Sequence, residues 1–546
     1  MTAAMIETHE VSNQVPPLEG YDAYGADPWL RAAVARAKVP WVEAPAHALG
    51  MYAGSPEARH HAMLANRYTP ELHTHDAGGH RIDVVEYHPS YHVLMNRAFN
   101  AGVHSMAWKC QPGGFSARAA LFYLWNQLEQ GTACPITMTF ASIAVFDQAP
   151  ALAREWRPKV LADAYDARPE PMARKSGVTI GMAMTEKQGG SDLRAVATVA
   201  VPDAGAWRLT GHKWFCSAPM SDGFFTLARL PEGVTCFFVP RSLPDGRRNT
   251  FLIQRLKDKV GNRSNASVEV EYRDTWAQLV GEPGRGIATL ISMAHHTRFD
   301  IVVGVAGMMR AALNLAMHHA RHREAFGKSV AEHALMSNVL ADLALECEAA
   351  TLLAFRLAAA FDAAAAGDAA QRDLQRALTP VAKYWLCKRM TPVATEAMEC
   401  LGGNGYVEES AAARLYREAP LNGIWEGSAN VICLDVLRAF ARSPETLAAL
   451  ESEISAGSDP RISRKLGAAL RILRDPAAAE PQARAVIESL ALCVQASLMK
   501  RHSDGRAAEA FCASRLDGGS HAFGALEMDA SALKAIAARA RLTPFA

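Results

Sequence analysis

The chain has 546 residues, of which 50% are hydrophobic and 21% charged, a composition typical of folded globular proteins. Its 57 Lys and Arg side chains nearly balance 56 Asp and Glu side chains, and the net charge of +1 argues against a protein that binds nucleic acid through its overall charge. The length exceeds that of one ordinary hydrophobic core, so we expect several packed domains.

The compartment is predicted from cysteine usage and from hydrophobic runs. The ten cysteines are scattered, with no C-x-x-C pair and no zinc-ligand spacing, which is typical of reduced thiols in a cytosolic protein. The N-terminus has no basic stretch before an apolar core, so we predict no secretory signal. No run of about 18 uninterrupted apolar residues occurs, so we predict no membrane partner. We therefore expect a cytoplasmic protein.

Residues 1–177 are predicted to form an N-terminal helical domain with an extended arm. The first 27 residues are polar, contain Pro16-Pro17, and are expected to wrap over a surface. From Pro28 to about 175, apolar residues recur near the 3.6-residue period, for example at 29–34 and 119–125, which indicates helices.

Residues 178–285 are predicted to form a β-barrel or sandwich domain. Short β-branched or aromatic segments, separated by turn residues, predict strands at 178–184, 195–201, 207–215, 223–230, 234–239 and 266–272. Pro-Asp-Ala-Gly at 202–205 and Pro-Glu-Gly at 231–233 are typical of hairpin connections.

Long Ala- and Leu-rich helices are expected again from 286 to 445, as a helical bundle domain, and residues 446–546 are expected to form a separate C-terminal helical extension. The predicted fold class is therefore mainly α with a central β domain. Its order is α domain, β domain, α bundle and helical extension.

The segment from Met184 to Asp192, Met-Thr-Glu-Lys-Gln-Gly-Gly-Ser-Asp, is a polar, glycine-bearing turn that leaves a predicted strand. The hydroxyls of Thr185 and Ser191, with exposed backbone N–H groups, suit contacts to a polar ring edge and a phosphate. This turn is one half of a predicted flavin site.

The other half lies more than 200 residues later, in Leu401-Gly402-Gly403-Asn404-Gly405-Tyr406 and Trp425-Glu426-Gly427-Ser428. A carboxylate held by a Gly-Ser turn beside an aromatic wall can act as a base on carbon. A Glu before Gly-Ser can also be a simple turn or helix-cap residue. The G-G-x-G string by itself is a weak signal, because such strings also close helices.

Five motifs in this order resemble the acyl-CoA dehydrogenase family of flavoproteins. They are residues 184–192, Trp214-Phe215-Cys216-Ser217, Arg323-Glu324-Ala325-Phe326-Gly327, residues 401–406 and residues 425–428. The resemblance implies FAD as cofactor and an acyl-CoA or other small-molecule substrate. It also implies a homotetramer, since flavin sites in this family sit at subunit contacts.

Within the family the chain resembles most the AidB branch, flavoproteins linked to the adaptive response to DNA alkylation. The supporting stretches are Asn13-Gln14 through Tyr21, residues 134–139, residues 255–259 with 261–267, and the extension after the bundle. The resemblance covers essentially the whole chain and is weakest after residue 446.

The resemblance makes Glu426 the catalytic base for a proton α to a thioester carbonyl. Its backbone N–H and a flavin ribityl hydroxyl would bind the thioester oxygen, and hydride would pass from the β carbon to the flavin. The implied cofactor contacts are Met182, Met184, Thr185, Gly190, Ser191, Phe215, Cys216, Ser217, Arg323, Ile424, Trp425, Gly427, Ser428, Asn430 and Leu434.

Several of these residues also have plainer interpretations. Arg323, whose planar fork would reach a pyrophosphate of the neighbouring subunit, could equally be a solvated charge in the basic run 318–323. Trp214 and Phe215 could be barrel core. The histidines at 318, 319 and 322 share helical spacing, but no carboxylate or cysteine completes a metal site, so we predict no metal.

The extension carries a basic stripe that suits DNA phosphates without reading sequence. Its candidate DNA-binding residues are Arg461, Arg464, Lys465, Arg471, Arg474, Lys500 and Arg501. A solvated helix face or a subunit contact is the alternative.

We therefore expect an AidB-like FAD flavoprotein that binds double-stranded DNA, protects against DNA alkylation damage and has weak or vestigial acyl-CoA dehydrogenase activity. The alternative is a metabolic acyl-CoA dehydrogenase for a short branched, isovaleryl-CoA-like thioester without a DNA role.

Overall fold

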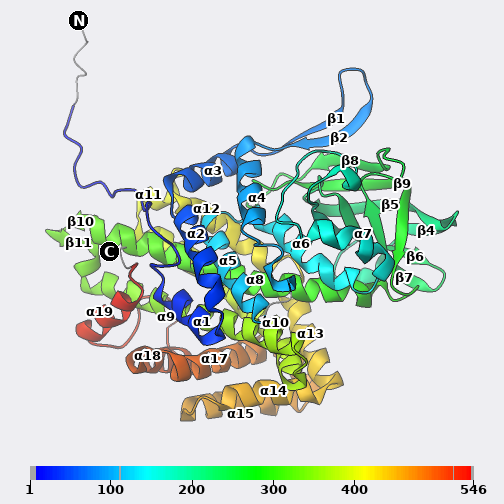
Figure 1. The fold of residues 1–546 in the computed structure, drawn as a ribbon. Coiled ribbons are helices and arrows are strands. Elements are labelled where there is room, and N and C mark those ends of the chain that lie inside the picture. Colours follow the sequence, from blue (N-terminus) through cyan, green and yellow to red (C-terminus); the bar gives the residue numbers. More distant parts are fainter. Residues whose placement is uncertain (1–7, 110–111, 521, 543–546) are drawn as a thin grey trace, which may run out of the picture.

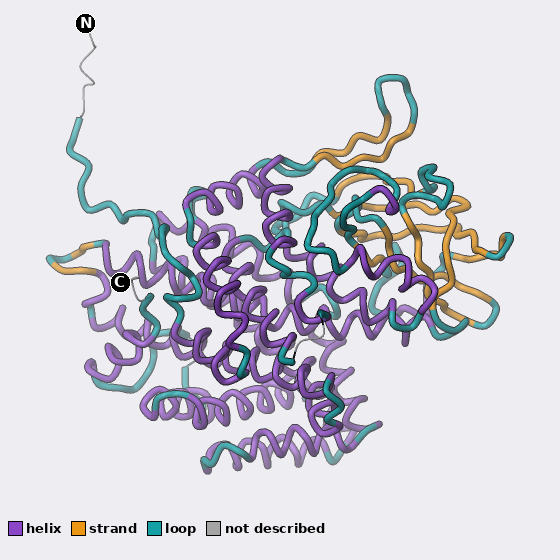
Figure 2. Tube along the Cα trace, viewed as in Figure 1, coloured by secondary structure: helices purple, strands orange, loops and turns teal. Residues whose placement is uncertain are grey.

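The computed structural model describes residues 8–109, 112–520 and 522–542. Helices fill most of the molecule and the main sheet forms one end of it, as Figure 2 shows in purple and orange. Residues 8–27 contain no helix or strand and lead along the surface into the first helix (Figure 1).

The N-terminal part is built from helices and one β-hairpin. Its elements are α1 (Pro28–Ala37), α2 (Glu43–Ala53), α3 (Pro56–Arg67), β1 (Glu71–His75), β2 (Arg81–Glu86), α4 (Pro89–Asn100), α5 (Gly114–Leu128), α6 (Ala133–Phe146) and α7 (Pro150–Val160). Helix α1 begins at Pro28 because Asp27 Oδ1 accepts the N–H groups of Trp29 and Leu30, at 3.0 and 3.2 Å.

The β1–β2 hairpin was not expected, because residues 28–175 were predicted to be helical. It projects clear of the helices in Figure 1. Asp-Ala-Gly-Gly at 76–79 is a hairpin turn signal, and it outweighs the helical periodicity on either side. Asp83, fully buried, fixes the base of the hairpin by accepting from Arg81 Nε and from the Ile253 N–H of the β domain.

The β domain contains β3 (Ile180–Ala183), β4 (Val199–Asp203), β5 (Ala206–Ser217), β6 (Gly223–Leu230), β7 (Gly233–Pro240), β8 (Phe251–Leu256) and β9 (Ser267–Val280). The sheet order is β3-β6-β4-β5-β9-β7, and β6 also pairs with β7, so the strands close into a ring. Strand β8 was not predicted; it pairs with β9, which is longer than the expected 266–272.

The helical bundle and the extension follow. The elements are α8 (Gly286–His322), β10 (Glu324–Ala325), β11 (Lys328–Ser329), α9 (Ala334–Ala365), α10 (Ala369–Cys400), α11 (Gly403–Tyr406), α12 (Ala411–Glu418), α13 (Ala429–Arg442), α14 (Pro444–Ser455), α15 (Pro460–Leu473), α16 (Pro476–Ala479), α17 (Ala483–His502), α18 (Gly505–Leu516) and α19 (Ala530–Arg539).

Two further observations define the core. Helix α8 is long and apolar enough to cross a membrane by composition, but 94% of its most apolar window is buried among the other helices, as in a core helix. The extension packs on the bundle: Trp385 Nε1 of α10 donates to Gln495 Oε1 of α17 at 2.8 Å, and both residues are buried. Helix α17 of the extension therefore packs directly on the bundle helix α10.

Helices α5 and α8 approach so closely that Gly307 cannot carry a side chain without displacement. A Cβ at Gly307 would lie 2.3 Å from the Tyr123 carbonyl oxygen. On α15, by contrast, a Cβ at Gly467 would meet Arg471 Nη1 at 3.8 Å, an ordinary contact.

We predict that Gly307→Ala destabilises the protein by about 1–3 kcal/mol through overpacking, although alanine favours helices. The matched variant Gly467→Ala should stabilise it by up to about 1 kcal/mol. Urea unfolding of both variants measures the difference. Equal effects of the same sign would contradict the close packing of α5 on α8.

Candidate active site

The loop that carries Glu426 joins the 3-10 helix Ala419–Gly423 to α13, and two cations hold its backbone. Lys383 of α10, 1% exposed, donates from Nζ to the carbonyl oxygens of Trp425 and Gly427, at 3.0 and 2.6 Å. Arg298 of α8 donates from Nε to the Glu426 carbonyl at 2.9 Å. Three consecutive carbonyls are thus bound, which fixes the loop against both α8 and α10.

The loop has a left-handed backbone at its centre. Glu426 has φ of 57° and Gly427 has φ of 108°. This region costs a non-glycine residue roughly 1–2 kcal/mol. A Cβ at Gly427 would lie 3.0 Å from Ile432 Cδ1, so the backbone also passes close to α13. Backbone strain at a single charged residue in a well-held loop is typical of a functional position.

The carboxyl group of Glu426 is shielded from water and only partly neutralised. Its Oε2 is buried and has no hydrogen-bond partner among the described residues. Burial raises the pKa of Glu426, while a hydrogen bond with Thr297 and the charges of Arg298 and Lys383 act in the opposite direction. A carboxyl with a raised pKa and an unused oxygen is suited to accept a proton from carbon.

The predicted turn at 184–192 is organised by Glu186. Its Oε1 accepts from Lys213 Nζ at 2.7 Å and from Thr198 Oγ1 at 2.6 Å, and both Glu186 and Lys213 are buried. Burial raises the pKa of Glu186, but the Lys213 ion pair and the surrounding hydrogen bonds outweigh it and lower that pKa to about 2. The Glu186–Lys213 ion pair holds the turn against β5. The side chain of Thr185 is half-buried and that of Ser191 is exposed.

Strand β5 presents alternate side chains to opposite sides. Phe215 is 50% exposed, whereas Cys216 is fully buried, so the Cys216 side chain faces the barrel interior. Ser217 shares a hydrogen bond with Ser267 at 2.9 Å between the hydroxyl oxygens. Met182 on β3 is buried as well. Of the predicted cofactor contacts, Cys216 and Met182 can therefore meet a ligand mainly through their backbone.

Cys134 at the start of α6 connects the two halves of the site. Burial raises the pKa of its thiol to about 12, the charge of Glu426 acts in the same direction, and a hydrogen bond with Ser217 opposes them. The β5 motif and the Glu426 loop, far apart in sequence, therefore converge on one helix terminus. Asn265 is fully buried, and its side-chain oxygen and nitrogen have no hydrogen-bond partner among the described residues.

The remaining predicted contacts lie in the Glu426 loop, in α13, or in the turn after β3. Ile424 is 65% exposed, and Trp425 is half-buried with its Nε1 donating to Asn422 Oδ1 at 3.2 Å. Asn430 accepts from Arg484 Nε at 2.8 Å. The other members of this group are Met184, Gly190, Gly427, Ser428 and Leu434, none of which is fully exposed except Ser428.

Arg323 is not part of this cluster. It follows the C-terminus of α8, whereas Arg298 lies near the other end, about 37 Å away at 1.5 Å per residue. Its Nη1 donates to the carbonyl oxygen of Asn13 in the N-terminal arm. Arg323 therefore lies far from the Glu426 loop of its own chain.

Sequence reasoning missed the residues that hold the Glu426 loop. Lys383 lies in the buried stretch 377–387 of α10, where no local sequence pattern marks its role. Arg298 and Thr297 belong to the run His-His-Thr-Arg-Phe-Asp at 295–300, in which the paired histidines are the more conspicuous residues. In the described part of the chain, no group of three or more His, Cys, Asp or Glu side chains is placed to hold a metal ion.

The residues present fit a flavin ring. The predicted contacts include an exposed aromatic ring (Phe215), an exposed aliphatic side chain (Ile424), a carboxyl with a buried, unused oxygen (Glu426), and hydroxyls at Thr185, Ser191 and Ser217. Such a surface suits a planar ring system with polar edges, whose faces need apolar contacts and whose edges need hydrogen bonds.

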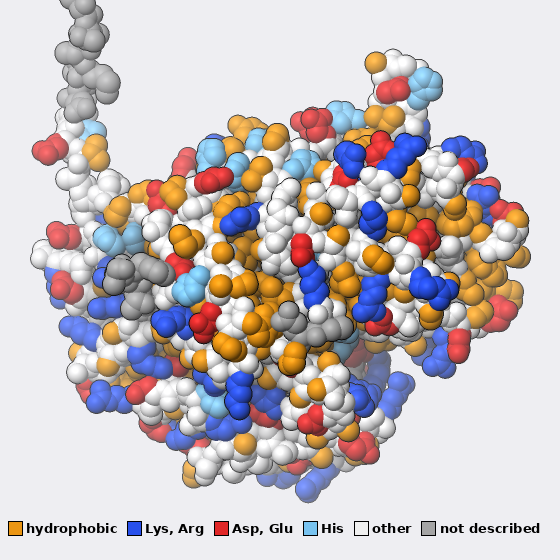
Figure 3. All heavy atoms as spheres, viewed as in Figure 1, with side chains coloured by type: hydrophobic (Ala, Val, Ile, Leu, Met, Phe, Trp, Pro, Cys, Tyr) orange, Lys and Arg blue, Asp and Glu red, His pale blue; other side chains and the backbone are white. Residues whose placement is uncertain are grey.

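The basic stripe of the extension is largely paired with carboxylates. Arg461 binds Asp459 and Glu509, Arg464 binds Asp517, Lys500 binds Asp459, and Arg501 binds Glu453. Lys465, Arg471 and Arg474 have no ion pair with a described residue, and the two arginines are exposed. Figure 3 shows Lys and Arg side chains mixed with acidic ones at the end of the molecule where the C-terminal helices lie.

Three family models match the chain: the adaptive response protein AidB N-terminal domain at residues 13–167, the acyl-CoA dehydrogenase middle domain at 181–275 and the acyl-CoA dehydrogenase C-terminal domain at 284–441. The putative acyl-CoA dehydrogenase AidB of Escherichia coli (strain K12) is 43% identical over 518 residues, which are 94% of this chain and 95% of that protein.

Solved structures share the fold. ACDH-11 of Caenorhabditis elegans in complex with C11-CoA superposes with a TM-score of 0.85 at 24% identity, over 97% of each chain. An acyl-CoA dehydrogenase of Bacillus anthracis complexed with FAD superposes with a TM-score of 0.64 at 17% identity, over 84% of this chain and 87% of the other.

We predict that Lys383→Met loosens the Glu426 loop, because two carbonyls lose their buried donor at a cost of about 1–3 kcal/mol each. Hydrogen exchange at 424–428 should accelerate, and the free energy of unfolding should fall. The control Lys388→Met removes an exposed lysine of the same helix and should change stability by less than about 0.5 kcal/mol. Unchanged exchange at 424–428 would show that Lys383 does not hold the loop.

Proposed function

The chain belongs to the acyl-CoA dehydrogenase family, in its AidB branch, and we propose that it oxidises acyl-CoA thioesters with Glu426 as the base. It is an FAD-dependent oxidoreductase by family. The observation that carries the proposal is the buried, unpartnered Glu426 Oε2 on a loop clamped by Lys383 and Arg298.

In the proposed reaction the Glu426 carboxylate takes the proton from the carbon α to the thioester carbonyl. Negative charge then grows on the thioester oxygen, which needs a hydrogen-bond donor. The backbone N–H of Glu426, on the loop that Lys383 and Arg298 hold, would donate to that oxygen. Bound FAD supplies the acceptor for the hydride that leaves the β carbon, so that a double bond forms between the α and β carbons.

We infer that the functional unit is an oligomer, a homotetramer by family resemblance, in the cytoplasm. Arg323 cannot reach the site of its own chain, so its predicted pyrophosphate contact requires a second copy. Large apolar side chains are also exposed in the motifs at 323–327 and 401–406. Phe326 is 97% exposed and Tyr406 is 77% exposed. Exposed apolar side chains of this size support subunit contacts.

We further propose that the protein binds double-stranded DNA and protects it against alkylation damage. The support is the similarity to AidB, which the family model describes as an adaptive response protein. The residues that carry it are Lys465, Arg471 and Arg474, which have no carboxylate partner among the described residues. The pairing of Arg461, Arg464, Lys500 and Arg501 favours the second candidate, a metabolic dehydrogenase for short branched thioesters without a DNA role.

We predict that Glu426→Gln retains FAD but lowers the rate of flavin reduction by acyl-CoA at least about 100-fold, because the base is lost. In the wild type, kcat/KM should fall on acidification with a midpoint above the ordinary Glu value of about 4.3, since the pKa of Glu426 is raised and the base must be ionised. Anaerobic stopped-flow bleaching measures both. Undiminished reduction in Glu426→Gln would refute its role, and the exposed Glu408→Gln serves as control.

We predict that Arg471→Glu/Arg474→Glu weakens binding to duplex DNA and lowers the slope of log K against log salt by about 2, since each arginine would neutralise one phosphate. Fluorescence anisotropy with a DNA duplex at rising salt measures it. Charge reversal at the exposed Arg372 and Arg376 positions of α10 should leave binding unaltered if the stripe is the site. An equal decrease in affinity in both variants would favour the metabolic candidate.

A further inference from the structure

The N-terminal part of the molecule contains a hollow of about 390 Å³ outside the candidate active site. Its walls come from the 3-10 helix η1 (Pro40–Val42), from α2, from the end of α4 and from the 3-10 helix η2 (Met106–Trp108). None of the described residues that line it is a predicted flavin contact or part of the Glu426 loop. Hollows of this volume are large enough for a small molecule.

Helix η2 lies between this hollow and α8. Met106 lines the hollow, whereas the Trp108 ring packs against the ring of His296 on α8, with ring centres 5.2 Å apart. Trp108 Nε1 also donates to the Phe140 carbonyl oxygen of α6 at 2.9 Å. The hollow and the helix that carries Thr297 are thus on different sides of η2. A molecule bound in the hollow would not have to displace an acyl-CoA beside Glu426.

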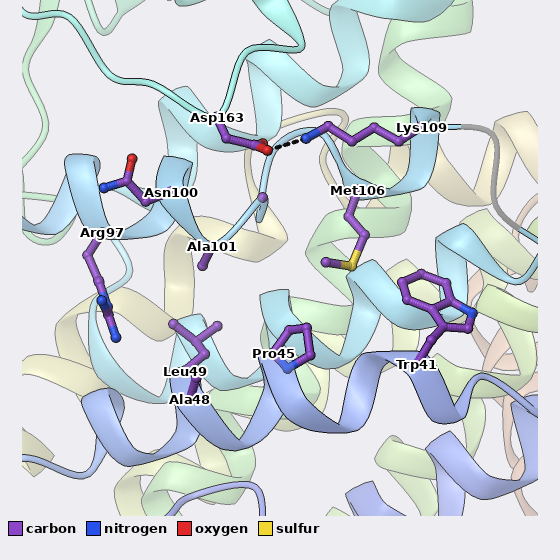
Figure 4. Close-up of a pocket in the computed structure, with 11 residues that line it drawn as sticks. Trp41, Pro45, Ala48, Leu49, Arg97, Asn100, Ala101, Met106, Lys109 and Asp163 are labelled. Atoms are coloured by element: carbon purple, nitrogen blue, oxygen red, sulfur yellow. Dashed lines mark hydrogen bonds and ion pairs between the residues drawn. The ribbon is translucent and has the colours of Figure 1, made fainter.

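Apolar side chains face each other across the hollow. Figure 4 shows Met106 on one side and Trp41, Pro45 and Leu49 on the other. A methionine sulfur makes favourable contacts with aromatic rings, and an indole packs on them in stacked or edge-to-face arrangements. These two walls therefore suit the flat body of an aromatic molecule.

The charged residues that line the hollow are Arg97, Lys109 and Asp163, and the last two neutralise each other. Lys109 Nζ donates to Asp163 Oδ2, and Ser105 Oγ donates to Asp163 Oδ1 at 2.9 Å, so both oxygens of this carboxylate are occupied. Arg97 lies at the end of the hollow away from Trp41 (Figure 4) and has no ion pair or hydrogen bond with a described residue. Its positive charge is the unpaired charge of the hollow.

The Arg97 guanidinium is held by an aromatic ring instead of by a carboxylate. Its central carbon lies 4.9 Å from the centre of the Tyr52 ring of α2. Packing on a ring restrains a guanidinium and leaves the N–H groups along its edge free. A carboxylate can accept two of these N–H groups in parallel. One carboxylate on an apolar body thus matches both the charge and the walls of the hollow.

We propose that this hollow is a binding site for an aromatic monocarboxylate. Arg97 binds the carboxylate, and the ring packs between Met106 and the apolar wall formed by η1 and α2. A rigid ring system loses less conformational entropy on binding than a flexible aliphatic acid does, which favours the aromatic ligand. The site does not depend on the proposed dehydrogenase function, because it shares no described lining residue with the Glu426 loop.

The test is isothermal titration of the flavin-loaded, full-length protein with 2-naphthoate and with its uncharged analogue 2-naphthamide. The wild type should bind 2-naphthoate with a Kd on the order of 10–100 µM. It should prefer the acid to the amide by about fivefold or more, because the carboxylate forms a charge-assisted pair with a partly solvated guanidinium. Equal affinity for the two compounds, or no binding of 2-naphthoate, would overturn the proposal.

Two substitutions of arginine assign the preference to one residue. Arg97→Gln should abolish the preference for the acid, because both compounds then meet an uncharged side chain. The matched control Arg67→Gln removes an arginine from the last turn of the neighbouring helix α3, as Arg97 stands in the last turn of α4, and should retain the preference. A preference that survives in Arg97→Gln would contradict the assignment.

Filling the hollow locates the ligand independently of charge. Ala48→Trp introduces an indole from an exposed lining position of α2 and should weaken 2-naphthoate binding by about tenfold or more through steric exclusion. Binding that is unchanged in Ala48→Trp but is displaced by an unreactive acyl-CoA thioether would place the acid in the dehydrogenase site and overturn the proposal. Tighter binding of octanoate than of 2-naphthoate would overturn the aromatic class of the ligand.

Discussion

The position of Glu426 depends on two cations, the fully buried Lys383 and the partly buried Arg298. Lys383 is taken out of water in the middle of α10, and burial lowers the pKa of its ammonium group. A buried ammonium needs acceptors, and the carbonyls of Trp425 and Gly427 provide them, while Arg298 takes the carbonyl between. Because the acceptors belong to the loop, the loop cannot move without leaving a cation unsolvated. Packing of α8 and α10 thus determines where the carboxyl of Glu426 lies.

The sequence predicted the architecture because the signals for it are local. β-Branched strands with Pro- and Gly-bearing turns, and long Ala- and Leu-rich helices, led to the mainly α fold with a central β domain, and the similar structures confirm it. The family resemblance and FAD are confirmed as well. The hairpin at 71–86 was missed because its turn signal, Gly78-Gly79, is a short interruption in a helical context.

The candidate site could be predicted in part. Its motifs identify individual residues, but they do not show which distant residues bind them. Glu426 could be chosen from its Trp-Glu-Gly-Ser setting, but Lys383 and Arg298 lie 42 to 44 and 128 positions from the carbonyls they bind. The same limit affects the charged residues. A count of basic residues on α15 cannot show that Glu509 of α18, and Asp517 just after it, neutralise Arg461 and Arg464. Pairing of this kind arises only from tertiary structure.

The continuity of α8 has a consequence for how this chain can vary in evolution. One unbroken helix of 37 residues carries Arg298, Thr297 and Asp300 near its start and delivers Arg323 at its end. Adding or deleting a single residue between them would rotate one end against the other by about 100°. Both groups of side chains could not then face their targets together. Length changes are therefore tolerable in the loops around α8, whereas within the helix only substitutions preserve its function as a spacer.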